Sequence, residues 1–343
     1  YFTHKKYFEK PLLGKLEEKV LANVREETAS YPRFDSYNKR IVIKNIAEGV
    51  DYDGGFSMKG TKFIGSGNEE ADAYLIFYRE KAPFLIAASK SFSITTDKIS
   101  STQTAIKIIL DKDSIYHPGL SFKFFMDKRQ VALIRDYKGI SNSPYFDSFH
   151  KIDMDFEALY WNIDENTMDM TNLIGGTKSD AQFESTDIFK LQRFEKFQGM
   201  SNTHPFYEIK QLMAQLDTNV FYVDDLTKKM RASKEQVQVM LMNLSIEGFV
   251  FYDFDKEKVI VKDRLNHYYY SRSFKEDYDV LEFKSDIKGE SNATLNLLNF
   301  DLKIKGVKYV LLSDAQQVYV FPQNQQLVLK KNRDFIFSGV IRA

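Results

Sequence analysis

The sequence contains no cysteine among its 343 residues. Disulfide bonds, thiolate zinc sites and cysteine nucleophiles are therefore excluded from its chemistry. The chain is still long enough to bury a core without cross-links, and its length favours two or three structural units over one. The lack of cysteine selects no redox compartment, because cytosolic and envelope proteins can both do without it.

An excess of charge of either sign is also missing, because 48 Lys and Arg residues balance 48 Asp and Glu residues. The chain therefore has no global field that would draw it to nucleic acid or to an anionic membrane. It also lacks the run of about 20 apolar residues that a membrane helix needs. Residues 1–10 do not contain the apolar stretch of a signal peptide. We predict no membrane-spanning segment and no nucleic-acid partner.

Aromatic residues are plentiful, with 29 Phe and 20 Tyr, and they favour half-buried, pleated strands. From Arg40 to about Ile174 the apolar residues recur with a period of two, for example in 74–78 and 105–108. The same alternation returns after His267, for example in 318–321. The pattern predicts a mainly β fold, arranged as a sandwich or as an irregular, β-solenoid-like stack of rungs.

Glycine pairs separate several of these predicted strands. We interpret Gly54-Gly55 and Gly65-Ser66-Gly67 as turns. They are not phosphate-binding loops, because neither precedes a predicted helix and no Gly-Lys-Ser/Thr sequence follows. Before the strands, Leu13, Leu16, Val20 and Val24 lie at helical spacing and predict a helix that Tyr31-Pro32 would end.

A second helical stretch interrupts the β pattern. Ser233 and Gln236 have the spacing of a capping box, and Gly199 follows a short apolar stripe in Asp187 to Gln198. The predicted helices are Pro205 to Leu216, Asp224 to Met230 and Ser233 to Glu247, and strands Phe249 to Phe254 and Lys258 to Lys262 follow. Three helices followed by a hairpin is the order of a winged helix.

These patterns predict four segments. They are an N-terminal connecting segment (1–40), a β domain (41–202), a winged-helix-like insert (203–267) and a second β domain (268–343). The chain starts without methionine, and residues 335–343 have the pattern of a strand that continues. We therefore expect both ends to lie inside a longer polypeptide.

A winged helix can bind DNA through its third helix, but the local charge argues against that here. Residues 205–265 contain nine Lys and Arg against ten Asp and Glu, a net charge of about −1. The third helix offers a mixed set to solvent, namely Lys234, Glu235, Gln238, Asn243 and Glu247. Such a surface releases few counterions from a polyanion. We interpret the unit as a structural or protein-contact element, with nucleic-acid binding as an alternative.

The best candidates for chemistry are Asp147, His150, Asp153 and Asp155, whose oxygen and imidazole ligands suit a metal ion. Their spacing matches no known motif. Alternation along 151–161 explains Asp153 and Asp155 as residues on the solvated side of one strand, and paired acids for glycoside hydrolysis would come from the same strand. The other histidines are scattered, and no Gly-x-Ser-x-Gly sequence occurs. We predict no catalytic, cofactor or metal site.

A resemblance can be stated from the phrases Val50 to Phe56 (VDYDGGF), Gly65-Ser66-Gly67, Asp113 to Leu120 (DSIYHPGL) and Lys330 to Arg333 (KKNR). They resemble internal stretches of very long, uncharacterised exported proteins of Bacteroidota. The resemblance covers most of the chain and implies a location in the cell envelope (periplasm or cell surface) or outside the cell. It implies no activity and no functional residue.

The sequence therefore predicts a non-enzymatic structural or interaction module of a large cell-envelope protein, whose partner is another protein or an envelope component. An unrecognised envelope enzyme or a carbohydrate-binding module is the alternative, because aromatic-rich strands can form a platform for sugars. Nucleic-acid binding by the winged-helix-like insert is the second alternative.

Overall fold

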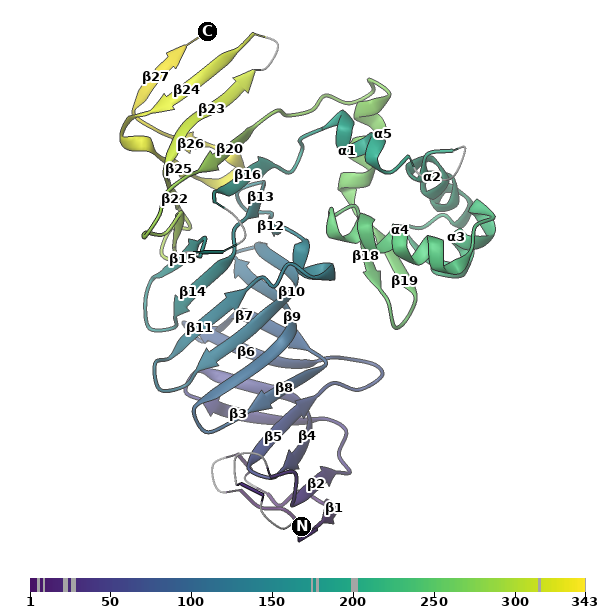
Figure 1. Cartoon of the computed structure of the whole chain (residues 1–343), viewed down its shortest axis with the longest axis vertical. Coiled ribbons are helices and arrows are strands. Elements are labelled where there is room, and N and C mark those ends of the chain that lie inside the picture. The colour runs from purple at the N-terminus through teal and green to yellow at the C-terminus, as the bar shows by residue number, and fades with distance from the viewer. Residues whose placement is uncertain are drawn as a thin grey trace. The chain divides into compact units, whose positions relative to one another are not determined.

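A computed structural model describes residues 1–4, 7–8, 10–20, 24–25, 29–173, 175–176, 179–198, 203–313 and 316–342 (Figure 1). The chain forms two compact units. Unit 1 consists of Tyr1–Asp136, Glu157–Leu173 and Ala293–Asp301, and unit 2 of Tyr137–Phe156, Ile174–Asn292 and Leu302–Ala343. Each unit thus combines three separate stretches of the chain. The four predicted segments are continuous and do not follow this division.

Unit 1 is built from antiparallel strands, as the period-two pattern predicts. Its strands are β1 (Gly14–Glu17), β2 (Arg33–Ser36), β3 (Ile41–Ala47), β4 (Val50–Lys59), β5 (Lys62–Ser66), β6 (Ala73–Arg79), β7 (Ala82–Ser89), β8 (Ser91–Ile94), β9 (Lys98–Leu110), β10 (Asp113–Phe125), β11 (Gln130–Ile134), β14 (Ala158–Asn162), β15 (Thr167–Thr171) and β21 (Ala293–Asn296). Antiparallel pairs run in the order β6–β7–β9–β10–β11–β14–β15–β21. β4 joins β2, β3, β5 and β6.

The core of unit 1 is aromatic. Phe77 packs edge-on against Phe124 with ring centroids 5.1 Å apart, and Phe84 packs against Trp161 at 5.0 Å. Phe77, Phe124 and Trp161 are each at most 1% exposed. Such rings add specific edge-to-face contacts to the large apolar area that they bury. Aromatic side chains of the sequence therefore pack the inner faces of these strands.

The interpretation of two glycine pairs as turns is wrong. Gly54-Gly55 lies inside β4, and Gly65 and Ser66 lie inside β5. The buried Tyr52 ring fills the space that side chains at Gly54 and Gly65 would need: an added Cβ would come within 2.4 Å and 2.6 Å of the Tyr52 hydroxyl. Glycine here marks the close approach of a ring, which sequence alone does not distinguish from a turn.

The helix predicted from Leu13, Leu16, Val20 and Val24 is also wrong. Residues 14–17 form β1, which pairs with β2, so that Leu16 lies opposite Phe34. The apolar stripe is largely solvated, with Leu16 at 64% and Val20 at 98% exposure. A helical stripe that buries nothing has no tertiary packing to hold it, and the backbone forms a ladder with β2 instead.

Unit 2 joins a second set of antiparallel strands to a group of helices. Its strands are β12 (Tyr145–Asp147), β13 (Ile152–Asp155), β16 (Ala181–Ser185), β17 (Val220–Tyr222), β18 (Val250–Asp253), β19 (Lys258–Val261), β20 (Glu282–Ser285), β22 (Leu302–Lys305), β23 (Val307–Ser313), β24 (Val318–Pro322), β25 (Gln326–Leu329), β26 (Phe335–Ile336) and β27 (Gly339–Arg342), and its helices are α1 (Leu191–Lys196), α2 (Pro205–Leu216), α3 (Val223–Met230), α4 (Lys234–Ile246) and α5 (Asp263–Arg272). Short 3₁₀ turns occupy Gly139–Asn142, Gln323–Gln325 and Lys331–Arg333. The predicted mainly β architecture is confirmed.

The three long helices of the insert are confirmed, with α2 at its predicted bounds. The capping box of α4 is formed: the Ser233 hydroxyl accepts from the Gln236 amide at 3.3 Å, and the Gln236 side chain accepts from the Ser233 amide at 3.1 Å. β18 and β19 form the predicted hairpin, and β17 adds a third strand to it. The sequence did not predict β17 or α5. α1 is shorter than predicted, and Gly199 lies outside the described residues.

These helices and strands share one core, whose largest members include Phe206, Phe249 and Tyr268. The three rings are in mutual contact, since Phe249 lies 4.8 Å from both Phe206 and Tyr268. Tyr268 belongs to α5, so α5 completes the core that α2, α3 and α4 begin. No helix in the described part of the chain is long and apolar enough to cross a membrane.

Candidate functional site

Asp147 and His150 form a buried pair. Both side chains are fully buried, and His150 Nδ1 lies 2.6 Å from Asp147 Oδ2. Asp147 Oδ1 also accepts from the backbone amides of Phe149 (2.9 Å) and His150 (3.0 Å). The carboxylate therefore holds the turn after β12 together, because it satisfies donors that would otherwise be buried without partners.

Asp153 and Asp155 lie on β13, the strand that pairs with β12, and the prediction of one solvated strand across 151–161 is wrong. That stretch forms two strands, β13 and β14, and Asp153 and Glu157 are each only 2% exposed. A buried carboxylate needs a partner, and Asp153 finds it in the Arg264 guanidinium of α5. Alternation along a strand does not show whether the second face is covered by another element.

Arg264 is one member of a charge network that joins the strands of unit 2 to its helices. Arg264 also donates to Glu184 of β16 at 3.0 Å. Arg193 of α1 donates two hydrogen bonds to the Glu184 carboxylate, at 2.8 and 3.0 Å. Its Nε also lies 3.3 Å from Glu247 at the end of α4. Bidentate contacts of this kind set the relative orientation of the two side chains as well as pairing their charges. The network therefore orients α1, α4 and α5 against β13 and β16.

A cavity of about 180 Å³ lies at this network. It is the feature of unit 2 that most resembles a site built from the predicted residues. Asp153 and Asp155 line it with three further carboxylates, those of Glu184, Glu247 and Glu282. Among the described residues, neither Asp147 nor His150 lines it. No group of three or more His, Asp or Glu side chains in the described part of the chain is placed to hold a metal ion. The structure thus separates the four predicted residues into two pairs.

The charges in this network depend on one another. Burial on its own would raise the pKa of Glu184, but the hydrogen bonds and charge of Arg193, with Arg264 and Lys190, outweigh burial and lower it from 4.5 to about 2. Burial also acts against the charge of Arg264, yet Asp153 and Glu184 raise its pKa above the usual range. Burial raises the pKa of Asp153, so its charge depends on Arg264. Glu184 is therefore a charged partner of arginines and is not poised to exchange protons near neutral pH.

Glu184→Gln is expected to remove part of the resistance of the protein to acid. Because the pKa of Glu184 is lowered to about 2 in the folded protein, its contribution is complete above the usual value of 4.5 and is lost as pH falls towards 2. That contribution is about 3 kcal/mol at neutral pH. Urea unfolding of both proteins across this pH range measures it: the gap between them should close as pH falls. A constant gap would contradict this assignment, and Glu48→Gln, at an exposed carboxylate, is the control.

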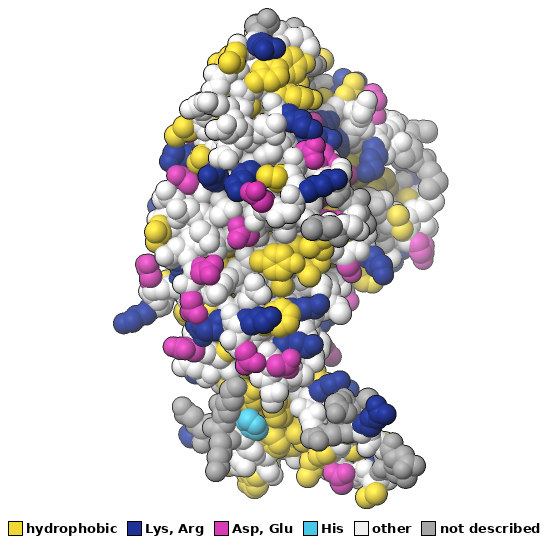
Figure 2. Space-filling model, turned by 60° about the vertical axis from the view of Figure 1, so that its left-hand side comes forward, with side chains coloured by type: hydrophobic (Ala, Val, Ile, Leu, Met, Phe, Trp, Pro, Cys, Tyr) yellow, Lys and Arg dark blue, Asp and Glu magenta, His cyan; other side chains and the backbone are white. Residues whose placement is uncertain are grey.

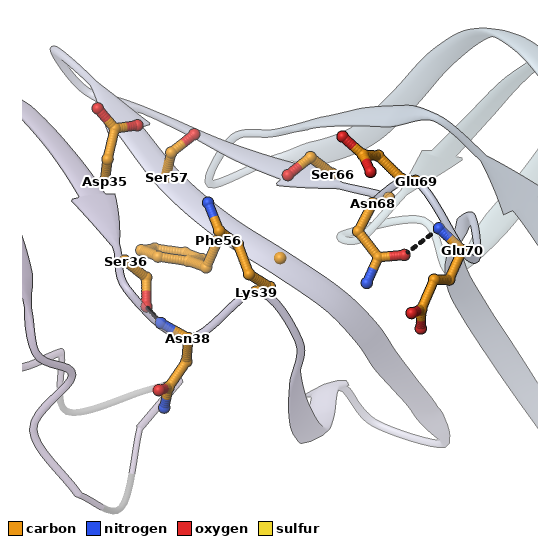
Figure 3. A pocket seen from close by; sticks show the side chains of 12 residues that line it. Asp35, Ser36, Asn38, Lys39, Phe56, Ser57, Ser66, Asn68, Glu69 and Glu70 are labelled. Atoms are coloured by element: carbon orange, nitrogen blue, oxygen red, sulfur yellow. Dashed lines mark hydrogen bonds between the residues drawn. The ribbon is translucent and has the colours of Figure 1, made fainter.

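Unit 1 carries a second candidate, an open groove of about 780 Å³. Its walls come from the end of β2 with the loop after it, from β4, and from the end of β5 with the loop after it (Figure 3). The labelled side chains are Asp35, Ser36, Asn38, Lys39, Phe56, Ser57, Ser66, Asn68, Glu69 and Glu70. The Asn68 amide oxygen accepts from the backbone of Glu70 at 2.9 Å and shapes one wall. Hydroxyl, amide and carboxylate groups suit a polar ligand, and Phe56 is only 4% exposed.

The remaining histidines contact backbone groups or aromatic rings, and His267 also lies 3.1 Å from the Glu276 carboxylate. His117 Nδ1 accepts from the Gly119 amide at 3.1 Å inside β10, and His204 caps α2 by accepting from the Phe206 amide at 3.2 Å. Burial lowers the pKa of His204, which stacks on Phe194. His267 contacts the Asp187 carbonyl at 2.7 Å, and His4 stacks on Tyr7. His117 and His204, which both precede proline, thus accept hydrogen bonds from nearby backbone amides.

No sequence pattern predicted the arginines that define the network. Arg264 lies 111 positions from Asp153, and no local pattern connects them. Comparison with known proteins found no matching family model, no matching curated protein and no matching solved structure.

Proposed function

We propose that this chain is a non-enzymatic structural and interaction module of a large exported cell-envelope protein. The observation that carries the proposal is the charge network of Asp153, Glu184, Arg193 and Arg264. Asp153 and Glu184 are engaged by arginines that hold helices against strands, and Asp147 with His150 holds a turn. Residues engaged in this way serve a rigid scaffold better than a reaction, which needs groups free to change protonation or charge.

We further propose that residues 203–267 form a winged helix that serves protein contact. The support is the order α2, β17, α3, α4, β18, β19, with β19 between the other two strands. On α4, Lys234 is held by Glu257 at 2.7 Å and by Asp224 at 3.3 Å. The helix then presents Glu235, Gln236, Val239 and Asn243 to solvent, without a free cation for phosphate.

The envelope location rests on the resemblance of the quoted phrases to exported proteins of Bacteroidota. The balanced surface agrees with a module that is held by neighbouring protein and not by anionic lipid. Figure 2 shows basic and acidic side chains interspersed over the visible face, with no continuous basic patch. The expected partner is therefore another protein or a component of the envelope.

The enzyme alternative can be separated from this proposal by a turnover assay. Purified cell-wall sacculi and envelope polysaccharides are incubated with the chain, and new reducing ends and free amino groups are measured. We expect none above the level without protein, for the natural chain and for Asp155→Asn alike. Product release that Asp155→Asn abolishes would overturn the non-enzymatic assignment, because Asp155 lines the 180 Å³ cavity.

The groove of unit 1 favours one alternative, a carbohydrate-binding module. Its hydroxyl, amide and carboxylate groups match the donors and acceptors of a sugar. Co-sedimentation with insoluble polysaccharide tests it. Binding that Asp35→Ala and Asn68→Ala both weaken would favour this function, and Lys308→Ala, in unit 2, is the control.

We predict no useful affinity for DNA. In a mobility-shift titration with mixed-sequence duplex at physiological salt, the chain should give no shift at micromolar concentration, because its α4 surface offers no free cation. The triple variant Glu235→Lys, Val239→Lys, Asn243→Lys places three cations on the solvent side of α4 and should produce a salt-sensitive shift. Salt-sensitive binding by the natural chain at micromolar concentration or below would contradict the prediction.

A further inference from the structure

His267 of α5 contacts the segment that leaves this helix. Residues 273–281 join α5 to β20 within unit 2 (Figure 1). The start of the segment is held by backbone hydrogen bonds to the last turn of α5, and its far end by the Asp279 amide, which donates to the Asp187 carbonyl at 3.0 Å. Between these two ends, the Glu276 carboxylate lies against the ring of His267. The contact therefore ties the middle of the segment to α5.

Both ring nitrogens of His267 face hydrogen-bond acceptors. Nε2 lies 2.7 Å from the Asp187 carbonyl oxygen, and Nδ1 lies 3.1 Å from the Glu276 carboxylate. A carbonyl and an ionised carboxylate can only accept, so each contact is a hydrogen bond only when its ring nitrogen carries a proton. A neutral imidazole has one N–H group, and an imidazolium has two. The two hydrogen bonds therefore exist together only in the protonated ring.

The two acceptors differ in their freedom to move, and this difference decides which hydrogen bond is lost in the neutral ring. The Asp187 carbonyl belongs to backbone that is fixed by the Asp279 amide and by the adjacent bridge between Ile188 and Asp279. The Glu276 side chain is 48% exposed and can turn into water. Nε2 therefore keeps its proton, because the hydrogen bond that one ring nitrogen makes sets the tautomer. The lone pair of Nδ1 then repels the Glu276 carboxylate.

The groups that face the ring can balance a positive charge on it. On α5 itself, the Ser271 hydroxyl lies 3.5 Å from Nε2. Arg333 is the one arginine that lines the adjacent cavity of about 390 Å³ in the described part of the chain, and it is paired with Asp187 at 3.2 Å and with Asp279 at 2.5 Å. The other titratable groups that line this cavity with His267 are Glu276, Asp277 and Tyr278. An imidazolium therefore lies beside carboxylates that Arg333 does not neutralise.

We propose that His267 and Glu276 form a pH-sensitive latch, which fastens segment 273–281 to α5 in mildly acidic solution and releases it as the ring loses the proton on Nδ1. The change falls between about pH 5 and 8, the range in which imidazole side chains change their charge. The latch acts on the connection between the helices and the strands of unit 2. It does not depend on which partner the module binds.

A spin label on a single introduced cysteine tests the latch, since the chain has no cysteine of its own. Lys275→Cys places the label at an exposed position beside Glu276. Its electron paramagnetic resonance spectrum should change from a restrained label to a more mobile one when the pH is raised from about 5 to about 8. Adding Glu276→Gln should remove this change, because a glutamine amide can donate to a neutral Nδ1 or accept from a protonated one. Val239→Cys, exposed on α4, is the matched control and should give the same spectrum at both pH values.

Nitrogen NMR of the His267 ring tests the order in which protons leave. The chain has 5 histidines, and the signals that disappear in His267→Gln identify this ring. Both ring nitrogens should carry protons at the acidic end of the titration, and only Nε2 at the alkaline end. Three results would each overturn the proposal: a label at position 275 whose mobility does not change with pH, a change that persists in Glu276→Gln, or a neutral ring protonated at Nδ1.

Discussion

Arg264→Ala is expected to lower the free energy of unfolding of unit 2 by about 3–5 kcal/mol. The substitution removes the partner of Asp153, which is 2% exposed, and one of the partners of Glu184. A carboxylate that stays buried without its arginine must either take up a proton or draw water into the core. Both outcomes destabilise the fold.

The chain offers two optical signals that separate its units in this experiment. Helices α1 to α5 all belong to unit 2, whereas the single tryptophan, Trp161, belongs to unit 1. In urea, Arg264→Ala should shift the loss of helical circular dichroism to lower concentration and shift Trp161 fluorescence less. The pair Asp153→Leu with Arg264→Met should recover most of the loss, because it leaves no buried charge unpaired. Lys308→Ala, at an exposed ion pair, is the control, and an equal effect of both alanine variants would sink the argument.

Asp147→Ala is expected to cost about 3 kcal/mol, and it decides whether the Asp147–His150 pair is structural. The variant leaves two backbone amides and the His150 ring without their common acceptor inside unit 2. Asp147→Asn keeps one oxygen for the amides and should cost less. Chemical unfolding followed by helical circular dichroism measures both.

Asp164→Ala is the matched control, because Asp164 also pairs with a cation but is 58% exposed. Its cost should stay within about 1 kcal/mol, as for most surface ion pairs. If Asp147→Ala were as mild as Asp164→Ala, the buried pair would not be holding the turn after β12. A chemical role for His150 would then need to be considered again.

Helices α2, α3 and α4 could be predicted from sequence because their signals are local. A capping box at Ser233, a proline at the first position of α2 and an apolar stripe along α4 each act within a few residues. Strand alternation likewise predicted β6, β9 and β24, since the side-chain period of two depends only on which face is buried.

The candidate site could not be predicted, because its determinants are distant in the chain. Asp153 looks like any acid on an alternating strand until Arg264 of α5 covers that face. The stripe from Leu13 to Val24 has helical spacing but no surface to pack on, and β2 offers a ladder instead. Periodicity predicts a helix or a strand only where the rest of the fold covers the apolar face that the pattern implies.

The ring of Tyr52 fixes the register of β4 against β5. It lies across Gly54 of its own strand and Gly65 of β5, and its hydroxyl donates to the Gly55 carbonyl at 2.5 Å. If β5 slid by one residue against β4, Ile64 or Ser66 would take the place of Gly65, and its side chain would meet the ring. The alignment of the two strands, and with it the walls of the groove, is thus fixed by the absence of two side chains.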